Sequence, residues 1–360
     1  MKITVLYGGQ SAEHEISILS AFNIIKAIDF GYYEVQPIFI TKQGKWIKGP
    51  LMAEPNQFME QLIFEPAQTA AFAVSPEETS TGLVILPGDI KEEDCVVFPV
   101  LHGPNGEDGT IQGFLEVLQL PYVGAGVTSS ACGMDKIISK HLFDQASLPQ
   151  VPYVAFDARD WQTDSQEWIQ KCEGSLLYPL FVKPANMGSS VGISRVEDSD
   201  QLKVAIDLAL EYDRRIVVEQ GIIASECEVA VIGNDDAHVS VVGRLIKESA
   251  FYDYEEKYIN NSVEMEIPAH IEDEVAAKIQ DYALRAYRAI DGRGLSRVDF
   301  FVTANDDVYI NEINTMPGFT PFSMYPSLWQ ATGLSYRDLI EELIQLAIHW
   351  HQERHHDRHE

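Results

Sequence analysis

Short apolar runs of strand length alternate with longer runs of helical spacing along most of the 360-residue chain. Ile3–Tyr7 is an apolar run, and Ile16–Ile28 after it places apolar residues at helical spacing. Val35–Ile40 and Cys95–Val100 are further strand-like runs. This alternation favours an α/β fold, and in its first region we expect a parallel sheet with functional loops at the carboxyl ends of the strands.

The middle of the chain predicts a long helix followed by strands. Thr128 can cap a helix that runs through Ala146. Pro149 and Pro152 are expected to end this helix. Residues 153–219 contain the motif FVKPANMGSSVGI and the strand-like run IVVEQ. The later expected elements are the strands Val229–Ile232, Val239–Leu245, Ser296–Val302 and Val308–Asn314, the amphipathic helix Glu272–Ala289, and a last helix from about Ser335.

A chain of this length exceeds what one hydrophobic core supports, so we expect several domains. The pattern predicts an N-terminal α/β domain over 1–127, a central unit over 128–220 and a C-terminal unit over 221–360. The His-rich ending HWHQERHHDRHE is interpreted as a solvated tail rather than a metal site.

Net charge excludes two classes of partner. The formal charge of −29 argues against nucleic acid and anionic membranes, which need clustered Lys and Arg. The chain begins directly with a strand-like run and has no signal-peptide pattern or apolar stretch long enough for a membrane span. Its scattered cysteines form no CxxC, which is typical of reduced thiols in a cytoplasmic protein. The cysteines are Cys95, Cys132, Cys172 and Cys227.

The segment RVDFFVTANDDVYINEIN predicts a β-hairpin whose turn is Asn305–Asp306. Paired residue numbers then sum to 611, which places Asp299 opposite Glu312 and Arg297 opposite Asn314, all on one face. Carboxylates that face each other across strands repel, so a cation between them is an economical explanation. Their oxygens suit Mg²⁺. The alternative is an outer sheet face with ordinary solvated charges.

A phosphate site is indicated upstream of this hairpin. Lys183 follows an apolar run, and the small residues of 188–192, which include Ser189 and Ser190, let backbone N–H groups approach phosphate oxygens. An ordinary hairpin turn is the alternative, and no GxxxxGK[ST] motif occurs. Lys136 and Lys257 are further phosphate candidates, although most single lysines are surface residues.

Two glutamates are candidates for the nucleoside. Glu219 ends the strand-like run IVVE, where it can accept the adenine amino group. Glu226 lies in an expected short loop after that run, where it can bind the ribose hydroxyls.

Three more motifs contain candidate functional residues. In GGQSAEHE, two glutamates at a helix start would repel phosphate and attract an amine, but helix capping by Ser11 explains them as well. The glycine- and acid-rich loop HGPNGEDGTIQG, which begins at His102, favours a functional role. In PGFTPFSM, backbone N–H groups and Ser323 can bind a carboxylate, and FYDYEEKY is expected to be a closing flap.

Taken together, these motifs resemble those of D-alanine–D-alanine ligases, which have the ATP-grasp fold. The resemblance runs in order through GGQSAEHE, HGPNGEDG, MDK, VKPANMGSSVG, VEQG, FYDYEEKY, RVDFF and NEINTMPGFTPFSMYP. It implies three α/β domains with ATP held between the central and C-terminal ones. It also implies that ATP phosphorylates the carboxylate of one D-alanine, whose acyl phosphate is attacked by the amine of a second.

The resemblance implies a role for each candidate. On the D-alanine side, Glu13 would hold the first ammonium with Ser189 and Tyr258, and His102 would lie close by. Arg297 and the Gly318 N–H would stabilise the oxyanion, while Ser323 and Met324 would bind the second carboxylate. On the nucleotide side, phosphates would be held by Lys136, Lys183, Ser190 and Lys257, adenosine by Glu219, Glu226 and Phe301, and two Mg²⁺ or Mn²⁺ ions by Asp299, Glu312 and Asn314.

The same resemblance implies a homodimer and a possible monovalent cation. Tyr258 favours D-alanyl-D-alanine over D-alanyl-D-lactate, since depsipeptide ligases commonly replace this tyrosine. Ser225 stands where the family often has an arginine. Alternatives that stay open are a depsipeptide ligase, another ATP-grasp carboxylate–amine ligase and a non-catalytic ATP sensor. A Rossmann dehydrogenase is disfavoured, because GGQSAE lacks the GxGxxG fingerprint.

Overall fold

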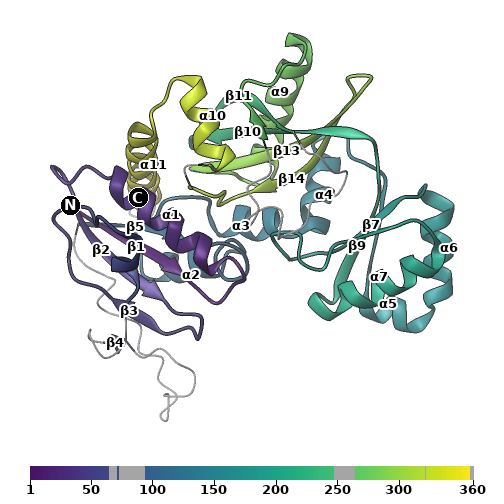
Figure 1. Ribbon diagram of the computed structural model, residues 1–360, viewed down its shortest axis with the longest axis horizontal. Coiled ribbons are helices and arrows are strands. Elements are labelled where there is room, and N and C mark those ends of the chain that lie inside the picture. Colours follow the sequence, from purple (N-terminus) through teal and green to yellow (C-terminus); the bar gives the residue numbers. More distant parts are fainter. Residues whose placement is uncertain (65–70, 73–93, 247–263, 321, 357–360) are drawn as a thin grey trace.

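Three sheets with flanking helices form the molecule, as a computed structural model shows (Figure 1). The structure describes residues 1–64, 71–72, 94–246, 264–320 and 322–356. Within these, no helix is both long and apolar enough to cross a bilayer. The mixed architecture confirms the α/β prediction.

The first sheet has the order β4-β3-β2-β1-β5, and β1 pairs in parallel with both β2 and β5, as predicted. Figure 1 shows this sheet at one end of the molecule, close to both chain termini. Its strands are β1 (Lys2–Gly8), β2 (Glu34–Ile40), β3 (Trp46–Lys48), β4 (Ala71–Phe72) and β5 (Cys95–Val100). Its helices are α1 (His14–Ala27), η1 (Met59–Leu62) and α2 (Thr110–Val117).

The second sheet, at the opposite end in Figure 1, is antiparallel and has the order β6-β9-β7-β8. It has a hydrophobic core of its own, which includes Val182, Leu202 and Val218. The strands are β6 (Tyr153–Asp157), β7 (Leu180–Pro184), β8 (Ser194–Val196) and β9 (Arg215–Gln220). The helices are α5 (Ala158–Thr163), α6 (Ser165–Ser175) and α7 (Ser199–Tyr212).

The third sheet has the order β12-β11-β10-β13-β14. Its C-terminal helices share one core with the first sheet, in which Val5 and Leu343 belong to the same cluster. The strands are β10 (Ala224–Ile232), β11 (His238–Ile246), β12 (Glu264–Glu266), β13 (Leu295–Thr303) and β14 (Val308–Asn314). The helices are α9 (Asp273–Ala289), α10 (Met324–Thr332) and α11 (Tyr336–His356).

The single helix predicted from Thr128 to Ala146 is wrong. Two helices occupy this stretch, α3 (Val127–Met134) and α4 (Lys136–Gln145). Asp135 has extended backbone between them, and its side chain accepts the N–H groups of Ile137 and Ile138. A carboxylate that caps a new helix explains the break, since it satisfies donors that lack intrahelical partners.

The predicted hairpin register is confirmed at the proposed site, where Asp299 pairs with Glu312 and Arg297 with Asn314. The predicted two-residue turn is wrong, because the pairing near the turn runs Val302 with Val308. A register shift follows Asp299, and it restores the expected pairing at the far end of the hairpin. Such a bulge adds one residue to one strand.

The His-rich ending, predicted to be a solvated tail, continues the last helix through His356. Arg354, within it, pairs with Glu116 of α2, and the guanidinium of Arg293 lies 3.6 Å from the ring centroid of Trp350. The last helix thus connects the first sheet's helices to the third sheet.

Gly8 provides a test of how β1 ends. Its φ is +93°, and an added Cβ would stand 2.2 Å from the Ile40 carbonyl oxygen. We predict that Gly8→Ala lowers the free energy of unfolding by about 2–4 kcal/mol, from backbone strain and steric overlap. Urea titration measures this. Gly113→Ala on α2, where an added Cβ meets nothing within 4 Å, is the matched control and should be neutral or stabilising. Equal effects would contradict the account.

Candidate functional site

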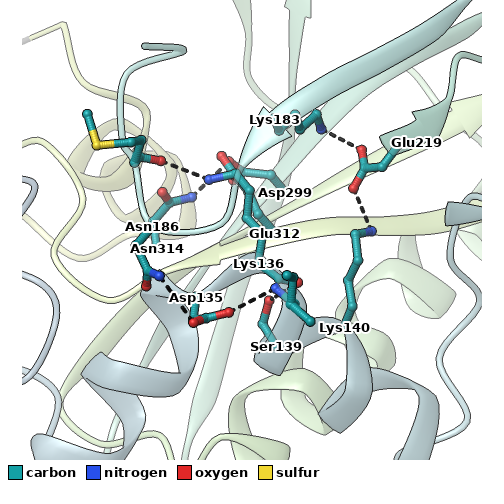
Figure 2. A network of polar contacts seen from close by, with 12 residues as sticks. Asp135, Lys136, Ser139, Lys140, Lys183, Asn186, Glu219, Asp299, Glu312 and Asn314 are labelled. Carbon is teal, nitrogen blue, oxygen red and sulfur yellow. Dashed lines mark hydrogen bonds and ion pairs between the residues drawn. The ribbon is translucent and has the colours of Figure 1, made fainter. Parts of the chain in front are cut away.

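An ion-pair cluster lies on one face of the third sheet. Arg297 donates through Nε to Asp299 Oδ1 and through Nη2 to Asp299 Oδ2, both at 2.7 Å. Asn314 Nδ2 donates to Asp299 Oδ2 at 2.9 Å, so the predicted cluster converges on Asp299. Glu312 points to the same centre, and Lys136 Nζ is 3.7 Å from its Oε2 (Figure 2).

Three carboxylates stand in a row across this sheet. Glu228 on β10 pairs with Asp299 on β13, which pairs with Glu312 on β14. Cross-strand neighbours lie about 5 Å apart, so the row is strongly repulsive without cations. Arg297 Nε lies 2.9 Å from Glu228 Oε2, which places the guanidinium between the first two carboxylates. The gap between the second and third has no such arginine among the described residues.

The donor set on this face suits a magnesium ion. Burial, then the neighbouring Glu312, raises the pKa of Asp299 in spite of Arg297, so more positive charge is needed to keep this carboxylate ionised. Two carboxylates and an amide oxygen are too few for a closed shell, and in the described chain no group of three or more His, Cys, Asp or Glu side chains is placed to hold a metal ion by itself. Mg²⁺ characteristically accepts such sets and completes its shell with phosphate and water.

Glu219 is buried between two lysines. Lys183 Nζ lies 2.5 Å from its Oε2 and Lys140 Nζ 2.7 Å from its Oε1 (Figure 2). Burial alone would raise the pKa of Glu219, but the two ammonium groups lower it to about 2. The Glu219 carboxylate is therefore fully charged at neutral pH. Lys183, a predicted phosphate ligand, is held by this pair on β7, an inner strand of the second sheet.

Lys136 and Asp135 hold the start of the serine-containing loop 185–192. Lys136 Nζ donates to the Met187 carbonyl at 2.9 Å, and Lys136 N–H to the Ala185 carbonyl at 2.9 Å. Asp135 accepts from Asn186 Nδ2 at 3.2 Å (Figure 2) and pairs with Arg215. The helix break reported above therefore has a second consequence, because it places Lys136 between this loop and Glu312.

Glu13 lies between two loops. A Cβ added to Gly103 would stand 3.2 Å from Glu13 Oε2, and one added to Gly188 3.3 Å. The predicted amine-binding carboxylate thus lies beside Gly188 of the serine-containing loop. Ser189 and Ser190 have φ values of 50° and 61°, a left-handed conformation that costs about 1–3 kcal/mol each and is concentrated at functional sites. Capping by Ser11 is limited to one contact, in which its Oγ accepts the Glu13 N–H at 3.2 Å.

His102 and Glu107 lie on the neighbouring loop. His102 is buried, and its Nδ1 is 3.1 Å from the Met316 carbonyl oxygen. Burial lowers the pKa of His102, so the ring is neutral at pH 7. Burial, then the nearby Glu13, raises the pKa of Glu107 to about 8, although Gly103 N–H donates to its Oε2 at 2.9 Å.

The loop after β14 returns beside these groups. Ser323 is the N-cap residue of α10, and its Oγ accepts the Thr320 N–H at 2.9 Å. A Cβ on Gly318 would stand 2.9 Å from Ser323 Oγ, so the two predicted substrate residues are neighbours. Met324 is buried and packs against Gly243 of β11.

Glu226 lies on strand β10, so the short loop expected there is wrong. It pairs with Phe301 on β13, two positions from the Glu228–Asp299 pair, which puts both nucleotide candidates on one sheet. Lys257 and Tyr258, with the whole proposed flap, lie outside the described residues.

Four residues with central contacts are absent from the sequence-based site. Lys140 follows Lys136 by four positions on a helix, so both lie on one face. This spacing is the signal that could have identified Lys140 from the sequence. Asp135, Glu107 and Glu228 carry no comparable pattern, since each acts through a partner distant in sequence.

Comparison with known proteins places these features in a family context. A family model described as D-ala D-ala ligase N-terminus matches residues 2–125, and one described as D-ala D-ala ligase C-terminus matches residues 142–345. The chain is 56% identical over 350 residues to a D-alanine–D-alanine ligase of Enterococcus faecalis, covering 97% of this chain and 99% of that one. It is 49% identical to one of Bacillus cytotoxicus, with 98% and 97% covered.

Solved structures agree with this. The D-alanine-D-alanine ligase from Coxiella burnetii superposes with a TM-score of 0.81 at 35% identity, covering 99% of this chain and 96% of that one. The VanG D-Ala:D-Ser ligase from Enterococcus faecalis gives 0.82 at 35% identity, with 96% and 99% covered.

The buried Glu219 pair predicts a pH-dependent contribution to stability. Because its folded pKa is depressed, the stabilisation is present above the unfolded pKa of about 4.3 and is lost as pH falls toward 2. We predict that Glu219→Gln destabilises by about 3–5 kcal/mol at pH 7, since it leaves Lys140 and Lys183 without their buried counter-ion. Urea unfolding of both proteins from pH 7 to pH 3 measures the difference, which should shrink below about pH 4.5. A difference that grows with acidity would refute the assignment.

Proposed function

The chain belongs to the D-alanine–D-alanine ligase family, and we propose that the site described above joins two D-alanines with consumption of ATP. The product is D-alanyl-D-alanine, a precursor for peptidoglycan synthesis. The observation that carries this proposal is that the groups of this site act on one another electrostatically: Glu13 and Arg297 both influence the pKa of Glu107, and Glu312 influences the pKa of both Arg297 and Lys183. An ATP sensor needs no oxyanion donor, whereas a ligase does.

The reaction balances in two steps. A carboxylate oxygen of the first D-alanine attacks the γ-phosphorus of ATP, so that ADP leaves and an acyl phosphate forms. The amine of the second D-alanine then attacks the acyl carbon, loses a proton and expels inorganic phosphate. Both steps bring anionic groups together, so the positive residues must offset their repulsion.

The proposed roles follow the positions of the side chains. Glu13 receives the first ammonium beside Ser189, close to the neutral His102. Arg297 and the Gly318 N–H stabilise the oxyanion, as preorganised donors do in a water-excluded site. Ser323 and Met324 bind the second carboxylate at the start of α10. Tyr258 is proposed for the first ammonium on motif position alone.

The nucleotide is proposed to bind between the second and third sheets. Lys136, Lys183 and Ser190 contact phosphates, while Glu219, Glu226 and Phe301 surround adenosine; Lys257 is added on motif position. Asp299, Glu312 and Asn314 hold Mg²⁺ or Mn²⁺, and a bound divalent cation would neutralise phosphate charge and orient the transferring group. Two ions, and a monovalent cation in addition, are proposed by family resemblance.

The remaining proposals concern the whole molecule. Domain boundaries at about 127 and 220 are proposed, although Phe143 and Leu148 pack in the core of the third sheet. We also propose a homodimer in the cytoplasm, for which the mass in solution should be twice 40.3 kDa.

The function is tested by ADP and phosphate release from ATP with D-alanine, L-alanine, D-lactate and D-serine, alone and in pairs. We predict fast release with D-alanine alone, because it fills both substrate positions, and accumulation of the dipeptide. D-alanine with D-lactate should give little depsipeptide. ATP turnover that is indifferent to D-alanine would sink the proposal, and preferred D-alanine–D-serine coupling would change the second substrate.

The metal assignment is tested by Glu312→Gln. We predict a loss of turnover of at least about 10²-fold, because one of the two opposed carboxylates no longer attracts the cation. The change should leave the thermal unfolding midpoint nearly unaltered or higher, since like-charge repulsion with Asp299 disappears. Glu264→Gln on β12, exposed and remote, is the control. Normal turnover at saturating Mg²⁺ would refute the assignment.

A further inference from the structure

Glu228 is a buried carboxylate on the reactive face of the third sheet, and no role has been given to it so far. Only 6% of its surface is exposed, and it lies on the central strand β10, between β11 and β13. Burial of an ionised carboxylate costs several kcal/mol unless a cation compensates it. The cation here is Arg297, whose Nε lies 2.9 Å from Glu228 Oε2.

The guanidinium of Arg297 has more donors than its two carboxylate partners use. Five N–H groups are available, and Asp299 accepts the one on Nε and one on Nη2, while Glu228 adds an ion pair beside Nε. Nη1 has no protein partner within the described part of the chain. The donors that remain are the two N–H groups of Nη1 and the second N–H of Nη2, and an oxyanion requires such donors.

Asp299 cannot by itself keep Arg297 in place. The same carboxylate oxygens that accept from Arg297 are proposed to hold a divalent cation, and Asn314 already shares Oδ2. Competition for these oxygens weakens their hold on the guanidinium. Glu228 stands one strand away from Asp299 on the side opposite to Glu312, so it is not one of the carboxylates proposed to hold the cation.

We propose that Glu228 is a positioning residue that holds Arg297 by an ion pair beside Nε and so keeps the Nη groups of this arginine directed toward the reacting carbonyl. The inference rests on the proposed function, since it assumes that Arg297 stabilises the oxyanion. The row across the sheet then alternates in charge, with Arg297 between Glu228 and Asp299. Partners that orient metal ligands change affinity or activity about 10- to 100-fold when removed, and we expect an effect of this size for a partner that orients Arg297.

The test begins with Glu228→Gln, which keeps the shape and removes the charge. We expect kcat to fall about 10- to 100-fold, with the KM for ATP within about twofold. A phosphinate isostere of the dipeptide, whose tetrahedral phosphorus carries the oxyanion, should bind more weakly by a similar factor in calorimetry, while ATP affinity is retained. A merely structural role would weaken both ligands alike.

The matched control is Glu266→Gln. It removes a carboxylate that pairs with Arg244 Nη2 at 2.6 Å on the same sheet, but far from Arg297 in the strand order. This control should keep kcat and phosphinate affinity within about twofold of the wild type. If Glu228→Gln does not fold, Glu228→Asp carries the test, because it keeps the charge and shortens the reach. It should lose kcat to an intermediate extent, and unchanged kcat would overturn the proposal.

A double-mutant cycle with Arg297→Met separates the possible failures. If Glu228 acts through Arg297, Glu228→Gln should cause no further loss of phosphinate affinity in the Arg297→Met protein. Additive losses would overturn the positioning role. Normal turnover by Arg297→Met would remove both the oxyanion role and this inference. Loss with Arg297→Met but normal behaviour of Glu228→Gln would overturn the inference alone and leave the proposed function standing.

Discussion

The repulsion among three neighbouring carboxylates is the constraint on which the site depends. Glu228, Asp299 and Glu312 face each other across three strands of one sheet, so cations must lie between them. Arg297 occupies the first interval. Burial, together with repulsion from Glu312 across the second interval, raises the pKa of Asp299, and the donor set there suits a divalent cation carrying phosphate. The repulsion among these carboxylates is thus offset by an arginine in one interval and, in our proposal, by the cation that accompanies the nucleotide in the other.

The architecture brings remote groups to this row. The first and third sheets share a hydrophobic core, so Glu13 and His102 are fixed relative to Arg297 and the loop after β14. The second sheet has a separate core and carries Lys183. Its connection to the row runs through α4, where Lys136 lies between Met187 and Glu312. ATP bound between Lys183 of the second sheet and the carboxylates of the third sheet would connect these two sheets.

Local patterns in the sequence were enough to predict most elements and the facing of Asp299 and Glu312. The two-residue period of a strand determines which side chains share a face. The predicted pairing of Asp299 with Glu312 is correct although the predicted turn is wrong, because the bulge after Asp299 compensates for the different turn length. The break at Asp135 was missed, since helical spacing continues on both sides of it and only the capping contacts reveal it. Glu107 and Glu228 were missed for a different reason. Their environments come from residues distant in sequence, which no local pattern encodes.

The central claim is that a divalent cation separates Asp299 from Glu312. Anomalous diffraction from crystals grown with Mn²⁺ and ADP tests it most directly, because manganese scatters anomalously and carbon, nitrogen and oxygen hardly do. The account predicts a manganese peak within about 2.5 Å of oxygens of both carboxylates, with Arg297 still paired to Glu228. Manganese bound elsewhere, with Asp299 still held bidentately by Arg297 and no ion beside Glu312, would contradict it.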